Sequence, residues 1–230
     1  MFRDYRHRCS GLADLFTEPK LKKDKDSGEL SETAKSSLSN VFISKMYGRH
    51  REVKSDYLEK GTYNEEEAFN LVISHPTFEK DFIMEGTTMQ DDFIKGTNDL
   101  HSTDFVIDTK CSFDIFTFHR SKISKDYLYQ LYGYARLLGY EKAYLVYCLL
   151  NTPQHIIDKY EKRIYYEYEN DIVLLNQKVE QLYKNSIFDD IPITERIKIM
   201  PIDFTDFDEF NSLLPSKVEK ARQYLNTLSL

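Results

Sequence analysis

Hydrophobic residues recur at every third or fourth position over several stretches of the chain, which is the pattern of amphipathic helices. Gly48 and Gly139 follow two of these stretches, as expected at helix ends, and Ser124 or Asp126 is placed to open the second of them. Ser10 is expected to cap a further short helix, whereas residues 17–30 are charged and predict an exposed loop. The longer helices are predicted over residues 31–46, 61–73, 124–139, 154–184 and 206–227.

Short runs of β-branched, aromatic and other apolar residues predict the strands. Between residues 92 and 117 such runs are separated by Gly, Asn and Ser, which predicts antiparallel strands joined by a tight connection. Residues 142–150 have the length and composition of a buried strand, and residues 196–202 predict another. Because strands alternate with helices, we expect an α/β fold with a mixed β-sheet flanked by helices, in a single domain over residues 1–230.

The triplet Asp108-Thr109-Lys110 follows three apolar residues that predict a strand buried on both faces. In a strand, residues two apart project to the same face, so the carboxylate and the ammonium lie together. An ordinary ion pair at a strand end would explain them. So would a metal ligand beside a cation that orients a water or stabilises a phosphoryl oxygen. Two other acid-x-Lys triplets, at residues 18–20 and 52–54, have no strand around them.

Two further carboxylates are placed to join Asp108. Asp99 lies nine residues earlier, and if the two residues lie on adjoining strands of a hairpin, both carboxylates reach one end of the sheet. Glu65 lies at the edge of the apolar stripe of the helix predicted over residues 61–73, and supplies a third. Magnesium prefers oxygen ligands and keeps several waters, so two or three carboxylates suffice. We therefore expect a carboxylate cluster at the surface that binds Mg²⁺.

Gln130 and Tyr134 lie four residues apart on one face of the helix predicted over residues 124–139. Such a pair is common on amphipathic helices. Its position after the acid-x-Lys strand nevertheless makes it a candidate for holding the substrate strand or the attacking water. The six histidines show no metal-ligand spacing, and His101 near the predicted site is expected to be solvated.

The order of a helical Glu, G-x-x-D, D-x-K and Q-x-x-x-Y resembles the PD-(D/E)xK nuclease superfamily in its RecB-like branch. Within it, the chain is most similar to the bacteriophage lambda exonuclease group, with the YqaJ-type viral recombinases. G-T-Y-N-E-E-E-A at residues 61–68 is similar to the group's Gly-x-x-x-Glu-x-x-Ala helix start, and T-N-D-L at 97–100 resembles its S-P-D-G turn without the Gly. D-T-K-C-S at 108–112 resembles its E-x-K-C-P strand, with Asp for Glu and Ser for Pro, and Y-Q-L-Y-G-Y at 129–134 resembles its Q-x-x-x-Y helix.

The resemblance implies a restriction-endonuclease-like fold and Mg²⁺-dependent hydrolysis of DNA phosphodiester bonds, with Mn²⁺ as a substitute ion. The implied activity is that of an exonuclease on linear double-stranded DNA, from 5′ ends, in phage-type recombination or DNA processing. The implied metal ligands are Glu65, Asp99, Asp108 and the carbonyl of Thr109, and the implied water-activating groups are Lys110 and Gln130. Members of the group form rings and work beside a single-strand annealing protein. The resemblance therefore implies that this chain could form a ring-shaped homo-oligomer and have such a partner, although no motif demonstrates either.

The N-terminal residues carry a basic cluster, with Arg3, Arg6 and Arg8 just ahead of Ser10. A helix N-terminus offers free N–H groups to an anion, and Arg side chains hold phosphate bidentately. The lambda-like nucleases have an Arg and a Ser near the start that receive the 5′-phosphate of DNA, and Arg3 and Ser10 match that pair in spacing. Arg3, Arg8, Ser10 and Tyr134 are therefore candidate substrate-binding residues. A basic arm that is simply solvated is the alternative.

Two other functions fit the same residues: a site- or structure-selective endonuclease of the same superfamily, and a catalytically inactive DNA-binding or interaction protein. The net charge of −7 argues against a nucleic-acid partner, because phosphate contacts usually need a basic surface. Residues 1–60, however, carry 13 Lys and Arg against 10 Asp and Glu. Clustered carboxylates that bind metal ions also invert the local charge, so charge alone leaves the question open.

The rest of the composition indicates the cellular compartment and the state of the cysteines. The chain has no run of about 18 apolar residues and no apolar stretch near its start, so we expect neither a membrane helix nor a signal peptide, and a cytoplasmic protein. Cys9, Cys111 and Cys148 are odd in number and far apart, which fits reduced thiols better than disulfides or zinc ligands. Most of the 17 Tyr and 15 Phe are expected in the core.

Overall fold

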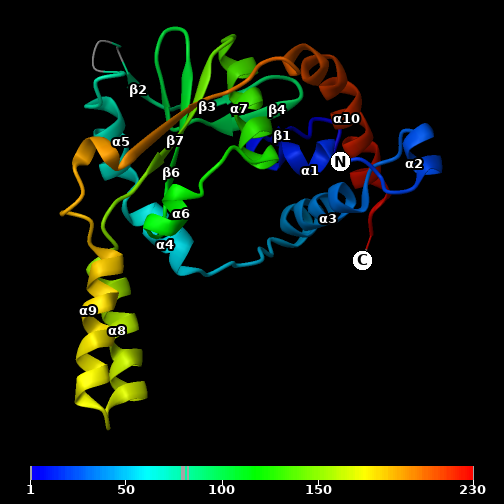
Figure 1. The fold of residues 1–230 in the computed structure, drawn as a ribbon. Coiled ribbons are helices and arrows are strands. Elements are labelled where there is room, and N and C mark those ends of the chain that lie inside the picture. The colour runs from blue at the N-terminus through cyan, green and yellow to red at the C-terminus, as the bar shows by residue number, and fades with distance from the viewer. Residues whose placement is uncertain (1, 79–80, 82, 230) are drawn as a thin grey trace.

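The computed structural model describes residues 2–78, 81 and 83–229, in which helices and strands alternate (Figure 1). The helices are η1 (Cys9–Gly11), α1 (Leu12–Phe16), α2 (Lys22–Asp26), α3 (Glu32–Tyr47), α4 (Asp56–Tyr63), α5 (Glu65–Ile73), α6 (Ile115–His119), α7 (Lys125–Leu138), α8 (Gln154–Tyr168), α9 (Ile172–Ser186), η2 (Ile193–Glu195) and α10 (Phe207–Thr227). The strands are β1 (His7–Arg8), β2 (Met84–Glu85), β3 (Thr88–Gln90), β4 (Ile94–Thr97), β5 (Leu100–His101), β6 (Val106–Cys111), β7 (Ala143–Cys148) and β8 (Ile197–Pro201).

The strands form two sheets. Five lie in the order β2-β5-β6-β7-β8 and three in the order β1-β4-β3. In the five-stranded sheet β6 and β7 are parallel, and the other neighbours are antiparallel. In the smaller sheet β1 runs parallel to β4, and β3 runs antiparallel to it. The predicted mixed α/β fold is therefore confirmed, with two mixed sheets where one was expected.

The two faces of the five-stranded sheet pack into different hydrophobic cores. Val106 and Leu145 belong to the larger core, which α1, α3, α7 and α10 complete, whereas Ile107 and Val146 belong to the smaller core with α5. This division follows from the pleat, because successive strand residues point to opposite faces. Aromatic side chains cluster in and against the larger core where α7 meets α10, although only nine of the described Tyr and Phe residues are buried, fewer than expected. The rings of Tyr129, Tyr132, Phe204, Phe207 and Phe210 contact one another at centroid distances of 4.8 to 6.1 Å.

Three of the predicted long helices have nearly the expected ends, and their caps explain why. Ser31 accepts a hydrogen bond from the backbone N–H of Ala34 at the start of α3, and Gly48 ends that helix in the left-handed conformation. Ser124 caps α7 through the N–H of Tyr127, and Gly139 ends it with a positive φ of 73°. The third, α10, spans 21 residues despite Pro215 within it.

Two predicted helices are each divided. The helix predicted over residues 61–73 begins only at Glu65, because Asn64 separates α5 from α4, whose last turn contains Gly61. The helix predicted over residues 154–184 is α8 and α9, which project from the rest of the molecule as a hairpin (Figure 1). Asp171 makes this break, because its side chain accepts a hydrogen bond from the N–H of Leu174 and begins α9.

The N-terminal segment also differs from the expectation. Ser10 lies inside η1 and caps nothing, and the five-residue α1 has Gly11 at its N-cap. The loop expected over residues 17–30 contains the short helix α2.

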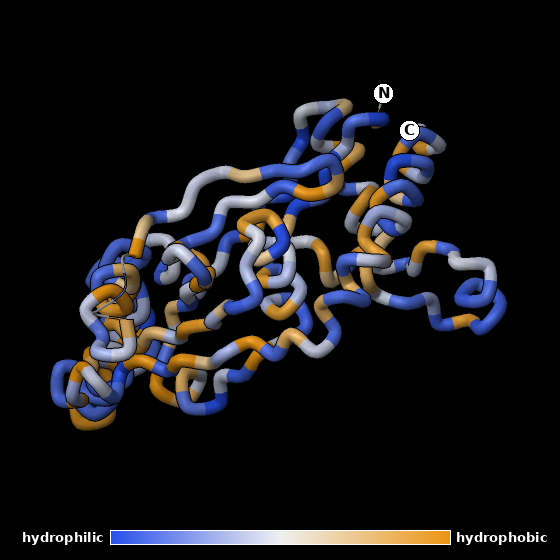
Figure 2. The backbone as a smooth tube through the Cα atoms, turned by 90° about the horizontal axis from the view of Figure 1, so that it is seen from above, coloured by the Kyte–Doolittle hydropathy of each residue, from blue (hydrophilic) through white to orange (hydrophobic). Residues whose placement is uncertain are grey.

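The two ends of the chain lie side by side in both views (Figures 1 and 2). The N–H of Phe2 donates to Oδ1 of Asn226 at 3.2 Å, and Arg222 Nε donates to the carbonyl of Tyr5 at 3.0 Å. Within the described residues, none of the helices has the length and apolar character to cross a membrane.

Candidate active site

Asp108 and Lys110 lie on β6, in the middle of the five-stranded sheet. Both share the face of Val106, which is the face that α7 covers. The Asp108 side chain is fully buried and that of Lys110 is 25% exposed, and Lys110 Nζ lies 2.5 Å from Asp108 Oδ2. A carboxylate cluster at the surface was the expectation. For Asp108 this was wrong, because α7 packs over this part of the strand.

The helix α7 brings two predicted residues to Asp108. Gln130 Nε2 donates to Asp108 Oδ1 at 3.1 Å and to the hydroxyl oxygen of Tyr134 at 2.9 Å. Tyr127, one turn before Gln130, lies with its ring centroid 5.1 Å from Lys110 Nζ. The side chains of Tyr127, Gln130 and Tyr134, at helical spacing on α7, thus lie on one side of the Asp108–Lys110 pair.

The close approach of α7 depends on Gly133. A Cβ added there would lie 2.7 Å from Leu12 Cδ1 and 2.8 Å from Cys9 Sγ, closer than real side chains come. The helix can therefore lie directly on η1 and α1. This contact sets the distance between the α7 side chains and β6.

Asp99 lies in the turn between β4 and β5 and reaches β6 through two hydrogen bonds. Its Oδ2 accepts from the N–H of Thr109 at 2.7 Å and from Thr109 Oγ1 at 2.8 Å. The strands β5 and β6 form the predicted antiparallel hairpin, with Leu100 opposite Ile107, so the next positions along are Asp99 and Asp108. The hairpin prediction is confirmed, and Asp99 lies directly before β5, opposite the Asp108 position of β6.

The turn that carries Asp99 is held by Gly86, whose N–H donates to the carbonyl of Asp99 at 2.8 Å. A Cβ at Gly86 would lie 1.5 Å from the carbonyl oxygen of Asn98, so a side chain would force the turn away. We expect Gly86→Ala to lower both the melting temperature and nuclease activity, measured by thermal unfolding and DNA cleavage.

The control is Gly61→Ala. A Cβ at Gly61 meets no atom of the described residues within 4 Å, and alanine is the better helix former by about 1 kcal/mol. This variant should be at least as stable as the wild type. Wild-type stability and activity in Gly86→Ala would contradict the role given to this turn.

Burial dominates the electrostatics of the pair. It raises the pKa of the Asp108 carboxyl from 3.8 to about 6, while Lys110 opposes the rise and Asp99 adds to it. Burial also acts to lower the pKa of Lys110, but the carboxylates of Asp108 and Asp99 outweigh it, so this pKa is raised. Lys110 is therefore protonated at neutral pH, and Asp108 holds its charge less firmly than an exposed carboxylate does.

Glu65 is the predicted site residue that the structure leaves apart. It is the first residue of α5 and is exposed, like Glu66 and Glu67. The N-terminus of α5 does lie beside the end of β6, because the carbonyl of Asn64 is 3.9 Å from Cys111 Sγ. Among the described residues, however, no three His, Cys, Asp or Glu side chains come close enough together to hold a metal ion by themselves.

The remaining pair of carboxylates fits a magnesium ion. Asp108 Oδ2 is buried, and its one close polar contact among the described residues is the ion pair with Lys110. Both bonds from Thr109 go to the same oxygen of Asp99. Magnesium is commonly held by one or two carboxylates together with waters and substrate phosphate oxygens. Asp99, Asp108 and the carbonyl of Thr109 form such a set.

The candidate phosphate-binding residues lie on a segment that is firmly docked. Phe2, Tyr5, His7 and Cys9 are buried, so alternate residues anchor the arm to the rest of the protein. The side chains of Arg3, Arg8 and Ser10 are exposed, whereas Arg6 Nε donates to the carbonyl of Asp91. Because Cys9 packs against Gly133, Ser10 lies close to the helix of Gln130 and Tyr134.

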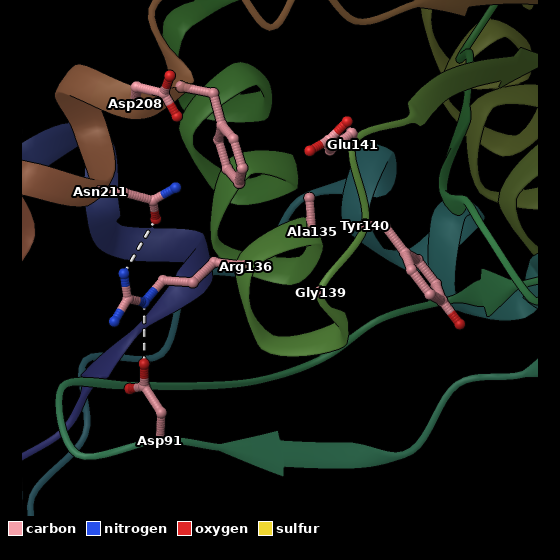
Figure 3. A pocket seen from close by; sticks show the side chains of 9 residues that line it. Asp91, Ala135, Arg136, Gly139, Tyr140, Glu141, Asp208 and Asn211 are labelled. Carbon is pink, nitrogen blue, oxygen red and sulfur yellow. Dashed lines mark hydrogen bonds and ion pairs between the residues drawn. The ribbon is translucent and has the colours of Figure 1, made fainter.

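An ionic clamp fixes the other end of α7. Arg136 Nε donates to Asp91 Oδ2 at 2.9 Å, and its Nη1 donates to Asn211 Oδ1 at 3.0 Å (Figure 3). Asp91 Oδ1 also accepts from the N–H groups of Phe93 and Ile94. The clamp therefore ties α7 to α10 and to the turn between β3 and β4. It lines a polar cavity of about 430 Å³, formed by these elements rather than by the carboxylate site.

Sequence reasoning missed two residues near the site. Tyr127 shares a helix face with Gln130 at a spacing of three, and that spacing could have found it. Lys60 is buried in α4, a helix that was not predicted, and its surroundings come from loops distant in sequence.

No family model and no curated protein matches the chain. Among solved structures, a phage-related exonuclease from Haemophilus somnus 129PT matches with a TM-score of 0.76 and 25% identity, over 97% of this chain and 94% of that one. An alkaline exonuclease, LHK-Exo, from Laribacter hongkongensis matches with a TM-score of 0.61 and 13% identity, over 97% and 91%. The same enzyme in complex with dAMP matches with a TM-score of 0.59 and 13% identity, over the same shares of the chains.

The two structures of LHK-Exo share only the fold with this chain. The phage-related exonuclease also has identical residues at a quarter of the aligned positions. The first neighbour is a phage-related exonuclease, which supports a nuclease activity for this chain. The structural neighbours thus confirm the resemblance that the motifs predict, to the lambda exonuclease-like, YqaJ-type nucleases of the PD-(D/E)xK superfamily.

Proposed function

We propose that the protein is a Mg²⁺-dependent exonuclease that hydrolyses the phosphodiester bonds of linear double-stranded DNA. The observation that carries the proposal is the group of Asp99, Asp108, Lys110 and Gln130 around the central strand β6. This group lies in a fold whose 25%-identical neighbour is a phage-related exonuclease. The catalytically inactive alternative is less well supported, because a buried carboxylate and a partly buried ammonium lie together at this position.

In this mechanism Asp99, Asp108 and the carbonyl of Thr109 would hold the ion, with Glu65 as the further ligand that the resemblance implies. When bound, Mg²⁺ lowers the pKa of a coordinated water and offsets charge on the phosphoryl oxygens. Lys110 donates to the attacking water or to a phosphoryl oxygen, since its ammonium is protonated and points at the Asp108 carboxylate. Gln130 keeps Asp108 oriented through its amide, and Tyr127 restricts the Lys110 side chain.

The test of the function compares linear and closed circular duplexes, with and without Mg²⁺, and with Mn²⁺ in its place. Exonuclease action requires an end, so the linear substrate should be degraded and the circle left intact. Cleavage of the circle would favour the site- or structure-selective endonuclease instead. Absence of cleavage with every metal would leave the DNA-binding protein as the remaining function.

The polarity of digestion is proposed to be 5′ to 3′, from a 5′-phosphate held by Arg3, Arg8 and Ser10. The support is that these exposed side chains lie on a docked segment next to the helix of Tyr134. The helix α1 has only five residues, so in this proposal the phosphate is held by side chains alone. We expect duplexes with 5′-phosphate ends to be digested faster than those with 5′-hydroxyl ends.

The measurement uses duplexes labelled on one strand, and Arg3→Gln is the variant. In Arg3→Gln the preference for the 5′-phosphate should disappear, while the rate on 5′-hydroxyl ends stays unchanged. The control is Arg49→Gln, which removes an exposed Arg outside the N-terminal segment. Equal wild-type rates on both ends, or loss of the 3′ label first, would contradict the 5′ polarity.

The complex of a neighbour with dAMP supports nucleotide binding at this fold. The nucleotide dAMP is the product expected when DNA is digested at a deoxyadenosine.

A ring-shaped homo-oligomer and a single-strand annealing partner are part of the same proposal. Light scattering of the purified protein, alone and with linear duplex, tests the oligomer. A monomer under both conditions would contradict the ring.

A further inference from the structure

Lys60, in the last turn of α4, is buried to an unusual degree for a lysine, with 1% of its surface exposed. Its Nζ donates to the carbonyl of Phe113 at 2.8 Å and to Thr152 Oγ1 at 3.2 Å. The rings of Phe113 and Phe188 flank it at 5.8 and 5.3 Å. The ammonium is thus held by two oxygens and two aromatic faces, contributed by three separate segments of the chain.

No carboxylate of the described residues lies close enough to Lys60 to form an ion pair, within 4.0 Å. Burial therefore lowers the pKa of Lys60 to about 8, and the more distant Cys111 on β6, Asp114 before α6 and Glu67 on α5 offset this only in part. Burying an unpaired charge opposes folding, and a methionine would fill the same space without that cost. A role in holding neighbouring segments would account for the lysine.

The partners of Lys60 show which segments it joins. Phe113 follows the end of β6 by two residues, and Thr152 lies between β7 and α8. Asn64, one helical turn after Lys60, makes a parallel connection, because its Nδ2 donates to the carbonyl of Asn151 at 2.9 Å. The junction of α4 and α5 is therefore fastened to the ends of both parallel strands. Glu65 is the next residue after this junction.

We propose that Lys60 is a positioning residue, which fastens the junction of α4 and α5 to the ends of β6 and β7 and so sets where Glu65 stands relative to Asp108 and Lys110. This inference rests on the proposed nuclease function for its catalytic consequence, but the fastening itself is a property of the fold. Lys60 touches neither Asp99 nor Asp108, so it acts through the backbone that carries Glu65. A small displacement of a group at a reaction centre has large effects on rate.

The test is Lys60→Met, which keeps the unbranched side chain but for its terminal ammonium group and removes both hydrogen bonds. The expected result is a fall in kcat of about tenfold or more, with KM for linear duplex unchanged, because DNA contacts elsewhere are kept. The melting temperature at pH 7 should not fall, since the variant also removes the buried charge. Hydrogen exchange of the amides of residues 61–68 should become faster. The matched control is Lys54→Met, in the same region but with an 81% exposed side chain.

Thr152→Val is the second variant, for use if Lys60→Met does not fold. It removes one hydrogen-bond acceptor of the Lys60 ammonium and keeps the charge of Lys60. It should raise exchange in residues 61–68 and lower kcat in the same direction by a smaller factor. Wild-type exchange and wild-type kcat in either folded variant would overturn the proposal. A wild-type protein without metal-dependent cleavage would instead overturn the nuclease function. The exchange of residues 61–68 would still decide whether Lys60 fastens the junction.

Discussion

Replacement of Asp108 by asparagine is expected to abolish DNA cleavage and yet raise the melting temperature in metal-free buffer above pH 6. Cleavage is lost because the amide cannot replace an anionic oxygen as a ligand for Mg²⁺. Asn keeps the shape of Asp and an oxygen that accepts the hydrogen bond from Gln130 Nε2. The fold should therefore be retained, and the loss of activity can be assigned to the site.

The gain in stability follows from the raised pKa of Asp108. A carboxyl whose pKa is about 6 in the folded protein and 3.8 in the unfolded chain binds its proton more tightly when folded. The free energy of unfolding therefore falls as the pH rises from about 4 to about 6, and the whole loss is present above pH 6. A shift of about two units corresponds to at most about 3 kcal/mol, an upper bound because Lys110 loses its partner in the variant.

The measurement is thermal unfolding of both proteins between pH 4 and pH 8, with and without Mg²⁺. The two melting temperatures should converge near pH 4, where Asp108 is protonated. Mg²⁺ should stabilise the wild type and leave Asp108→Asn unchanged, since binding to the folded state alone raises stability. The control is Asp104→Asn, whose 54% exposed carboxylate pairs with Lys142. Full Mg²⁺-dependent cleavage by Asp108→Asn would disprove the assigned site.

Replacement of Lys110 by methionine is expected to lower the cleavage rate by roughly 10²–10³-fold, as loss of a transition-state donor does. The variant should still bind metal, because Asp99 and Asp108 are unchanged. The pKa of Asp108 should rise further, since Lys110 is the cation that holds it down. The acid limb of the pH–rate profile should therefore move to higher pH.

The profile is measured from pH 5 to pH 10 at saturating Mg²⁺, and metal affinity by calorimetry. The matched control is Lys142→Met, which removes the 63% exposed lysine of the pair with Asp104. Exposed pairs contribute roughly 0–1 kcal/mol, so this control should behave like the wild type. A loss of metal affinity in Lys110→Met equal to its loss of rate would contradict the role of Lys110 as a donor.

The parts of the site that the sequence predicts are those set by local geometry. The period of two in a strand places Asp108 and Lys110 on one face, and the period of 3.6 in a helix places Gln130 and Tyr134 together. The caps at Ser124 and Gly139 define α7 almost to the residue. These features depend on neighbours within a few positions, so a single sequence contains them.

The parts that the sequence does not predict depend on packing between distant segments. The burial of Asp108 arises because α7 lies directly on η1 and α1 through Gly133, which no local pattern indicates. The separation of Glu65 from the other carboxylates depends on how α4 and α5 meet the ends of β6 and β7. The break at Asn64 was missed because Gly61 was interpreted as the start of a helix and lies in the last turn of the preceding one.

The docking of the N-terminal arm on α10 has a consequence for synthesis on the ribosome. Arg222 donates to the carbonyl of Tyr5, and Phe2 donates to Asn226, so residues more than 200 positions apart hold each other. Contacts of such separation form only after the later residue has left the exit tunnel. The segment with Arg3 and Ser10 therefore lacks its contacts with α10 while the intervening part of the chain is synthesised. A nascent chain that has not yet exposed residues 222 and 226 lacks these two contacts, and its arm is held by the pairing of β1 with β4 and by the hydrogen bond from Arg6 to Asp91.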